Sequence, residues 1–206
     1  QGQAAVVAAA PEVSAETLRP WVLPMIFARE QGEHRLFLTE LRPAVALFLR
    51  FTGIDYDADE QAGEKLDALI CQAQAALERF EGALLQLTIG DKGSYLYAAF
   101  GAPLVHEDDA RRAVQAALAL RTACARLDFL APVQIGLSQG VMRSGAYGGT
   151  TRRTYGVLGD DVNLAARLMS SAAPGEIMLP RRVQKEVRDL FSFEPRPPLL
   201  LKGKSE

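Results

Sequence analysis

The spacing of apolar and polar residues predicts a strand and then a helix in the first half of the chain. Residues 43–52 (PAVALFLRFT) are almost continuously apolar and are bounded by Pro43 and Gly53, which is typical of a buried strand. Residues 60–80 repeat apolar side chains at helical spacing, with charged residues on the opposite side. The apolar positions of this predicted helix are Leu66, Leu69, Ile70, Ala73, Leu77 and Phe80.

A hairpin and a second long helix are predicted next. Residues 84–89 (LLQLTI) and 94–100 (SYLYAAF) are two short, largely apolar runs separated by the turn GDKG at 90–93. A glycine-containing turn of this kind between two such runs is a strong hairpin signal. The helix covers about residues 107–127 and carries two aspartates in its first turn, where the helix dipole favours negative charge.

The second half of the chain is predicted to alternate short strands with helices. We expect strands at 133–142, 154–159 and 176–180, a glycine-rich basic loop at 143–153, helices at 160–171 and 181–190, and closing strands at 191–195 and 199–204. Strands and helices alternate, but the hairpin in the middle makes a purely parallel sheet a poor interpretation. The order favours an α+β sandwich of ferredoxin-like type, with a mostly antiparallel sheet and helices on one face.

Two segments of different character divide the chain. Residues 1–40 begin with a small-residue, alanine-rich stretch and continue as a short helix and connector, so we interpret them as a linker. Residues 41–206 carry the alternating elements and form the predicted domain. The chain begins with Gln1 and ends abruptly after LLLKGKSE, and we therefore expect a piece of a longer protein.

Composition and charge exclude several classes of protein. The 206 residues include 23 Lys and Arg and 25 Asp and Glu, for a net charge of −2 and a pI near 5.8. This balance argues against nucleic-acid binding, and no apolar run is long enough for a membrane span. Cys71 and Cys124 are far apart without metal-ligand spacing, which fits a cytoplasmic protein. His34 and His106 likewise lack ligand spacing.

The predicted helix at 160–171 carries the most informative pair of polar side chains. Asn163 and Arg167 are four residues apart and therefore share one face of the helix. Val162, Ala166 and Met169 form the neighbouring apolar stripe that would dock the helix. Such a pair is by itself most often a solvated helix edge, so its meaning depends on the surrounding sequence.

Several stretches, taken together, resemble the catalytic domain of the class III nucleotidyl cyclases. The strongest is YGVLGDDVNLAARL at 155–168, and further matching stretches occur in the family's order: GSYLYAAFG at 93–101, HEDDARRAVQAAL at 106–118, VQIGLSQGVMRSGAYGG at 133–149 and LKGKSE at 201–206. The resemblance covers about residues 41–206. It implies the family's fold, a ferredoxin-like core that works as a dimer with its sites at the interface.

The resemblance also implies a reaction and a set of roles. In this family the 3′-hydroxyl of a nucleoside triphosphate attacks the α-phosphorus, and pyrophosphate leaves. The transition state needs charge stabilisation and in-line positioning. By position, Asn163 corresponds to the asparagine that positions the ribose, Arg167 to the arginine at the α-phosphate, and Lys202 to the lysine that binds the outer phosphates.

The chain departs from the family at both metal-binding aspartates. The first should follow Phe48-Leu49, where this chain has Arg50, whose guanidinium cannot bind a metal ion. Counting back from Gly101 places Ser94 at the second position, and Asp91 lies three residues too early. The resemblance therefore implies that this chain binds no metal itself, and that Mg²⁺ or Mn²⁺ is held by a partner domain.

Within the family, the likeness is greatest to the second catalytic domain of the soluble, bicarbonate-responsive adenylyl cyclases. In that group the lysine of Asp-Lys-Gly reads the adenine, which gives this role to Lys92. Gly156, seven residues before Asn163, lies at the second purine-reading position and offers backbone groups alone. The resemblance implies the C2-type half of an adenylyl cyclase, which binds ATP and needs a second cyclase domain.

Two alternatives stay open on the sequence. The chain could be a non-catalytic regulatory module that keeps the fold to pair with a true cyclase. It could also be an autonomous homodimeric cyclase in which Asp91 serves as a metal ligand. The preference for ATP over GTP is not determined by the residues.

Overall fold

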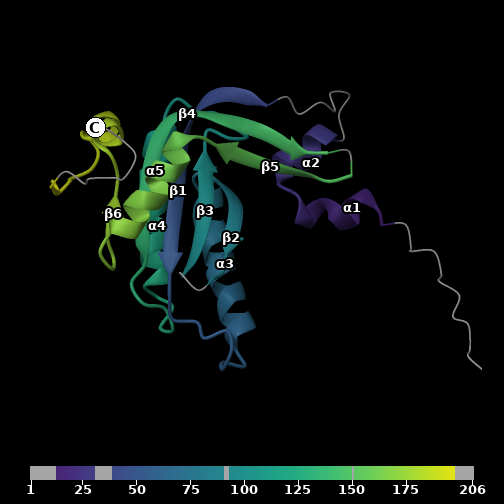
Figure 1. Ribbon diagram of the computed structural model, residues 1–206, viewed down its shortest axis with the longest axis horizontal. Helices are drawn as coiled ribbons and strands as arrows, with labels where there is room; N and C mark the ends of the chain where they lie inside the picture. The colour runs from purple at the N-terminus through teal and green to yellow at the C-terminus, as the bar shows by residue number, and fades with distance from the viewer. Residues whose placement is uncertain (1–12, 31–38, 91–92, 150, 198–206) are drawn as a thin grey trace, which may run out of the picture. The chain divides into compact units, whose positions relative to one another are not determined.

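A computed structural model describes residues 13–30, 39–90, 93–149 and 151–197. Strand β1 (Glu40–Phe51) lies at the centre of its sheet (Figure 1). Strand β1 pairs antiparallel with β3 (Ser94–Phe100) on one side and with β4 (Gln134–Gly148) on the other. The remaining strands are β2 (Ala83–Thr88) on β3, β5 (Arg153–Leu158) on β4, and β6 (Ile177–Met178), which pairs in parallel with the start of β4. Neighbouring strands in the order β2-β3-β1-β4-β5 are all antiparallel, and the pairing of β6 with β4 is the one parallel pairing among the described strands. The sheet is therefore mostly antiparallel, and the predicted fold class is confirmed.

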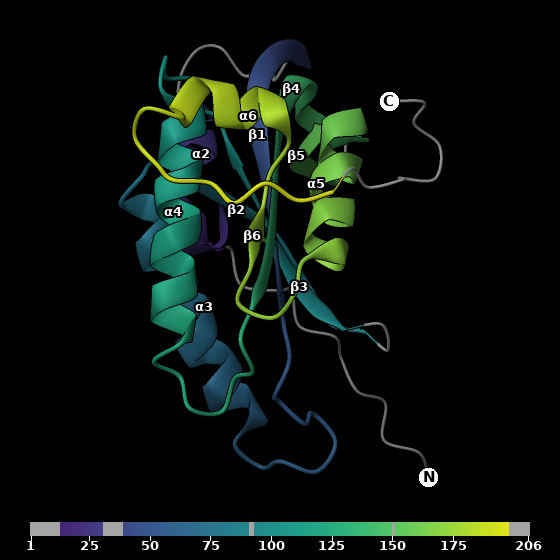
Figure 2. The same ribbon diagram turned by 90° about the vertical axis from the view of Figure 1, so that its left-hand side faces the viewer.

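Alternate residues of β1 point into two separate cores. Leu47, Leu49 and Phe51 lie in the first core, whereas Ala46 and Phe48 lie in the second. Helices α3 (Ala62–Glu78), α4 (Asp109–Cys124) and α6 (Arg181–Val187) contribute to the first core, and α5 (Asp160–Ser171) contributes to the second. Figure 2 shows α5 and the α3–α4 pair on opposite sides of the sheet. The expectation that the helices lie on one face of the sheet was therefore wrong. Strand β1 is apolar on both faces, so helices must cover both faces of the sheet to bury its side chains.

The described elements agree with most of the predicted ones, and the differences are local. The predicted helix at 160–171 has the bounds of α5, while α3, α4 and α6 are a few residues shorter than predicted. The predicted loop at 143–153 is wrong in its first half, because residues 143–148 continue β4 and pair with β5. Residues 191–195 form no strand. Residues 199–204 lie outside the described residues.

The N-terminal part of the chain forms a separate compact unit, with the division at residue 36. It contains α1 (Ala15–Leu18), the 3₁₀ turn η1 (Arg19–Trp21) and α2 (Pro24–Glu30). Ser14 is the N-cap of α1, because its hydroxyl accepts a hydrogen bond from the backbone N–H of Thr17. Among all the helices described, none has both the length and the apolar character that crossing a membrane requires.

The backbone of helix α5 lies directly against the backbone of strand β4. A Cβ atom added at Gly136 would lie 2.2 Å from the carbonyl oxygen of Ala165 and 2.2 Å from the backbone nitrogen of Met169. Gly140, four residues further along β4 and on the same face, lies against the carboxylate of Asp161. Small residues on the strand thus fix how closely the helix that carries Asn163 and Arg167 can lie.

We expect Gly136→Ala to lower the free energy of unfolding by about 1–3 kcal/mol, because the added methyl group overlaps backbone atoms of α5 that cannot move independently. Gly63→Ala in α3 is the matched control, since no atom lies within 4 Å of a Cβ added there. The control should be neutral or stabilising by up to about 1 kcal/mol. Urea unfolding of both variants checks this, and equal stabilities would contradict the proposed close contact.

Candidate functional site

Helix α5 presents Asn163 and Arg167 on one exposed face. The helix begins at Asp160, directly after β5 and the N-cap residue Gly159. Both side chains are exposed, while Ala165, Leu168 and Met169 on the other side are buried. The structure therefore brings the two predicted residues together, one helical turn apart, and leaves them accessible to a ligand or to a second domain.

The strand that leads into α5 is fixed by a buried tyrosine. The Tyr97 hydroxyl donates a hydrogen bond of 2.8 Å to the carbonyl oxygen of Val157, and its ring stacks on Phe48 with centroids 4.5 Å apart. Burial raises the pKa of the Tyr97 hydroxyl well above its ordinary value, so it remains a donor at any physiological pH. This bond ties β3 to β5 and sets the position from which α5 begins.

Gly156 lies on β5 opposite Gly145 of β4. A Cβ added at Gly156 would find its nearest atoms in the Tyr147 ring, at 3.5 Å, which is an ordinary van der Waals contact. Tyr147 is itself held by a hydrogen bond of 3.0 Å from its hydroxyl to the carbonyl oxygen of Arg143. The site therefore has room for a side chain at position 156, although this chain has none there.

The structure places Arg50 and Ser94 at the adjoining ends of neighbouring strands. Phe51 and Ser94 are paired across β1 and β3, so Arg50 and Ser94 lie diagonally. The Arg50 side chain packs against Gly93, where an added Cβ would lie 2.9 Å from its Nε. The Ser94 side chain is buried, and its Oγ lies 3.5 Å from the hydroxyl oxygen of Tyr56.

These two residues do not fit a divalent cation. A guanidinium has no lone pair to donate, and a single neutral hydroxyl does not replace two carboxylates. Within the described residues there is no group of three or more His, Cys, Asp or Glu side chains that could hold a metal ion. Asp91 and Lys92, between β2 and β3, and Lys202 near the C-terminus lie outside the described residues, and their roles stay predictions.

A family model for the adenylate and guanylate cyclase catalytic domain matches residues 51–206. The chain belongs to this family. Human adenylate cyclase type 10 is 31% identical over 134 residues, which are 65% of this chain and 8% of that protein. The rat protein of the same name is 28% identical over 155 residues, which are 74% of this chain and 10% of that protein. The chain thus spans a tenth or less of the length of these relatives.

Solved structures of cyclases share the fold of this domain. The adenylyl cyclase CyaB from P. aeruginosa superposes with a TM-score of 0.75 at 22% identity, covering 82% of this chain and 92% of that one. The guanylyl cyclase Cya2 gives a TM-score of 0.74, also at 22% identity, covering 82% of this chain and 89% of that one. At this identity the likeness supports the cyclase fold alone.

Sequence reasoning missed two polar clusters of this cyclase domain. Asp161 at the start of α5 contacts Ser138 of β4 and Arg182 of α6. His106, expected to be a solitary histidine, has its Nε2 3.2 Å from a Glu81 carboxylate oxygen and its Nδ1 3.2 Å from an Asp109 oxygen. The contacting residues of the two clusters are between 3 and 44 positions apart in the sequence. A local sequence motif therefore cannot predict the longer-range contacts.

We expect Tyr97→Phe to lower the free energy of unfolding by about 1 kcal/mol, because the Val157 carbonyl loses a buried donor. Tyr95→Phe is the matched control. Tyr95 lies on the same face of β3, and no hydrogen bond from its hydroxyl is found within the described residues. Urea unfolding measures both, and a loss of the same size in the two variants would contradict a specific role for the Tyr97 bond.

Proposed function

We propose that this domain is the C2-type half of an adenylyl cyclase, which converts ATP into cyclic AMP and pyrophosphate together with a second, metal-bearing cyclase domain. One observation carries the proposal. The domain presents Asn163 and Arg167 on an exposed face of α5, while Arg50 and Ser94, which the motif assigns to the family's two metal-aspartate positions, lie at adjoining ends of β1 and β3. Each half of such a pair would supply what the other lacks.

The roles of the chain's own residues follow from their chemistry. Arg167 carries a permanent positive charge, suited to the negative charge that develops at the α-phosphate. Asn163, one turn earlier, has an amide that can orient the ribose through hydrogen bonds. We assign the outer phosphates to Lys202 and the adenine to Lys92. The partner domain would hold Mg²⁺ or Mn²⁺, which activates the attacking hydroxyl when bound.

The choice of ATP rests on the relatives and on Lys92. The similar human and rat proteins are named adenylate cyclases. Lys92 lies in the sequence Asp-Lys-Gly, whose lysine reads adenine in the group that the chain resembles. Gly156 contributes no side chain to purine selection. We also keep the expectation of a cytoplasmic protein, since both cysteines, Cys71 and Cys124, are free thiols.

A regulatory role is the second candidate, and the residues at the metal positions favour it. A module that pairs with a true cyclase without catalysing anything would have no need of carboxylates where Arg50 and Ser94 stand. It would also have no need of Arg167 in contact with nucleotide. The two candidates therefore differ in what happens when Arg167 is removed.

The first test reconstitutes the pair. The isolated domain should make no cyclic AMP above background with Mg²⁺ or Mn²⁺. Activity should appear when it is mixed with a family domain that has both metal aspartates but alanine in place of its own Asn and Arg. In the active pair, Arg167→Ala should lower kcat by about 10²–10³-fold, the usual loss for a preorganised charge stabiliser.

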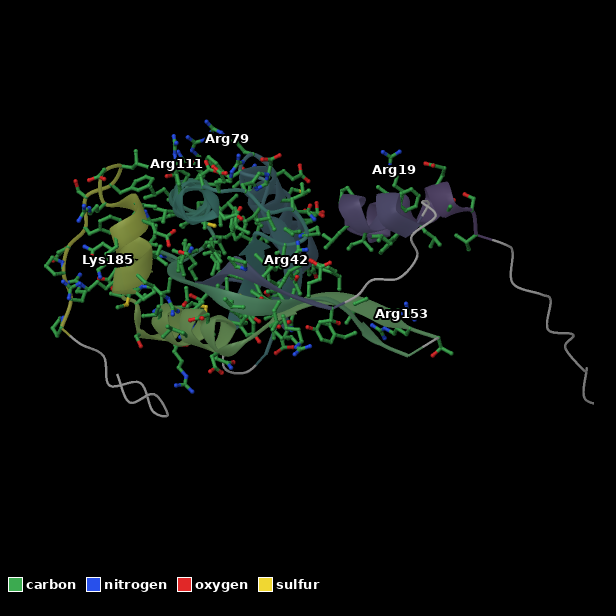
Figure 3. All side chains as sticks on the ribbon, turned by 90° about the horizontal axis from the view of Figure 1, so that it is seen from above. Arg19, Arg42, Arg79, Arg111, Arg153 and Lys185 are labelled. Atoms are coloured by element: carbon green, nitrogen blue, oxygen red, sulfur yellow. The ribbon has the colours of Figure 1, made fainter. Side chains whose placement is uncertain are left out.

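Arg111→Ala is the control for this test. Arg111 is an exposed residue of α4, on the opposite side of the sheet from α5, and Figure 3 shows it pointing outward. It should leave kcat unchanged. Full activity of Arg167→Ala would contradict the catalytic assignment and favour the regulatory one. Turnover by the unmixed domain would contradict the half-site and point to Asp91 as a metal ligand.

The second test concerns the purine. Gly156→Asp adds a carboxylate that can accept from the 6-amino group of adenine and repels the 6-oxo group of guanine. We expect the ratio of kcat/KM for ATP over GTP to rise about tenfold, which is about 1.4 kcal/mol. Gly149→Asp adds the same charge to the same hairpin, where no atom lies within 4 Å, and should leave the ratio unchanged. Equal ratios in the two variants would contradict the assignment of position 156.

A further inference from the structure

Helix α6 lies across an edge of the sheet, between the two layers of helices. Strand β4 pairs with β1 along one side. Along its other side it pairs with β6 at residues 135 and 136 and with β5 from residue 143 onward. On that side residues 137–142 of β4 have no neighbouring strand among the described residues. Val183 and Val187 of α6 are buried in the first core, together with α4. Figure 2 shows α6 crossing this edge between α4 and α5.

Arg182 of α6 reaches the opposite layer, where α5 begins. Its Nη2 donates to the Ser138 hydroxyl at 2.6 Å and also to Oδ1 of Asp161. The Ser138 hydroxyl in turn donates to the same Asp161 oxygen at 3.1 Å. The three groups form a closed triangle that joins α6, β4 and the first turn of α5.

Asp161 needs this triangle. Its side chain is 13% exposed, and its second carboxylate oxygen lies directly against Gly140 of β4. A carboxylate so far removed from water is unfavourable unless a counterion and hydrogen-bond donors compensate it. Arg182 supplies the counterion, and although burial lowers the pKa of its guanidinium, an arginine stays charged at neutral pH.

The triangle holds the inner side of α5, opposite the residues that face outward. Helical geometry turns about 100° per residue, so Asn163 is about 200° and Arg167 about 240° around the axis from Asp161. A guanidinium group lies roughly 8 Å from the helix axis, so a rotation of the helix by about 10° would move it by more than about 1 Å. A misplacement of about 1 Å can cost on the order of 10²-fold in rate.

We propose that Arg182 is a positioning residue for this cyclase domain: through Asp161 and Ser138 it fixes the rotation of α5 and hence the directions of Asn163 and Arg167. The proposal rests on the proposed function for its effect on turnover, but its effect on α5 is independent of that function. Arg182 touches neither nucleotide nor metal in this scheme, so it acts on kcat through the helix alone.

The experiment compares Arg182→Met with Arg112→Met. Arg112 also pairs with two carboxylates, those of Asp108 and Glu81, but it lies on α4 in the other layer. Three quantities are measured: amide hydrogen exchange of α5 in the isolated domain, the melting temperature, and kcat and KM of the reconstituted pair. Arg182→Met should speed exchange at residues 160–168 and lower kcat about tenfold or more, with KM within about twofold. Arg112→Met should lower the melting temperature without changing the hydrogen exchange of α5 or the kcat of the pair.

A second variant separates position from stability. Asp161→Asn in the Arg182→Met background removes the buried charge and keeps an oxygen that can accept from Ser138. We expect it to recover most of the exchange protection of α5 and most of kcat. A conservative Arg182→Lys variant should retain part of both, since it restores the charge without the planar fork.

Each result decides the matter. Unchanged exchange at α5 in Arg182→Met overturns the proposal, whatever the activity. A fall in kcat that simply follows the melting temperature in both Arg→Met variants also overturns it. Faster exchange at α5 with no activity in any reconstituted pair supports the anchoring of α5 and contradicts the proposed function instead.

Discussion

Helix α5 lies so close to strand β4 that the two backbones touch, and a residue without a side chain at Gly136 makes this possible. The direction of Asn163 and Arg167 follows from that contact. Because the inner face of the helix rests on backbone atoms and on the buried Asp161 carboxylate, the helix has little freedom to shift or rotate. The exposed face is therefore held rigidly, which suits the role proposed for Arg167, because a group that stabilises a developing charge must be held in place beforehand.

The two faces of the sheet differ in a way that allows this close contact. β1 contributes Ala44, Ala46 and Phe48 to the core that includes α5, and Val45, Leu47, Leu49 and Phe51 to the core that includes α3 and α4. On the α5 side, Gly136 and Gly140 of β4 leave room for the helix backbone and for the Asp161 carboxylate. The glycines of β4 therefore set how closely α5 can lie on that face.

Periodicity in the sequence was enough to predict most of this architecture. The bounds of α5 and the hairpin of β2 and β3 follow from helical spacing and from the glycine-containing turn. The shared face of Asn163 and Arg167 follows from their four-residue separation. The second half of β4 was misjudged, because glycines and arginines at 143–148 are typical of a loop. These residues form a strand because β5 pairs with them, and this pairing depends on the tertiary structure rather than on the local sequence.

The contacts of Arg182 were beyond sequence reasoning for a similar reason. Arg182 is 21 positions from Asp161 and 44 from Ser138, and an arginine in the first turn of a short helix has no expected partner. What brings the three together is the open edge of β4, which α6 occupies. The family resemblance could identify residues at fixed places in a motif, but it could not identify a supporting arginine that lies outside those motifs.

The distribution of charge in the domain supports the proposal that another domain completes the site. Arg167 and Arg50 both carry permanent positive charge, one exposed on α5 and one packed against Gly93 at the start of β3. The described residues supply no carboxylate cluster to balance a bound cation. A triphosphate brings about four negative charges and needs cations close to it. On the proposed function, a domain that offers Arg167 and Asn163 but, among its described residues, no group of metal ligands is half of a binding site. On the same proposal the exposure of Asn163 and Arg167 has a physical reason, because groups that complete a site across an interface face solvent in the separated domain.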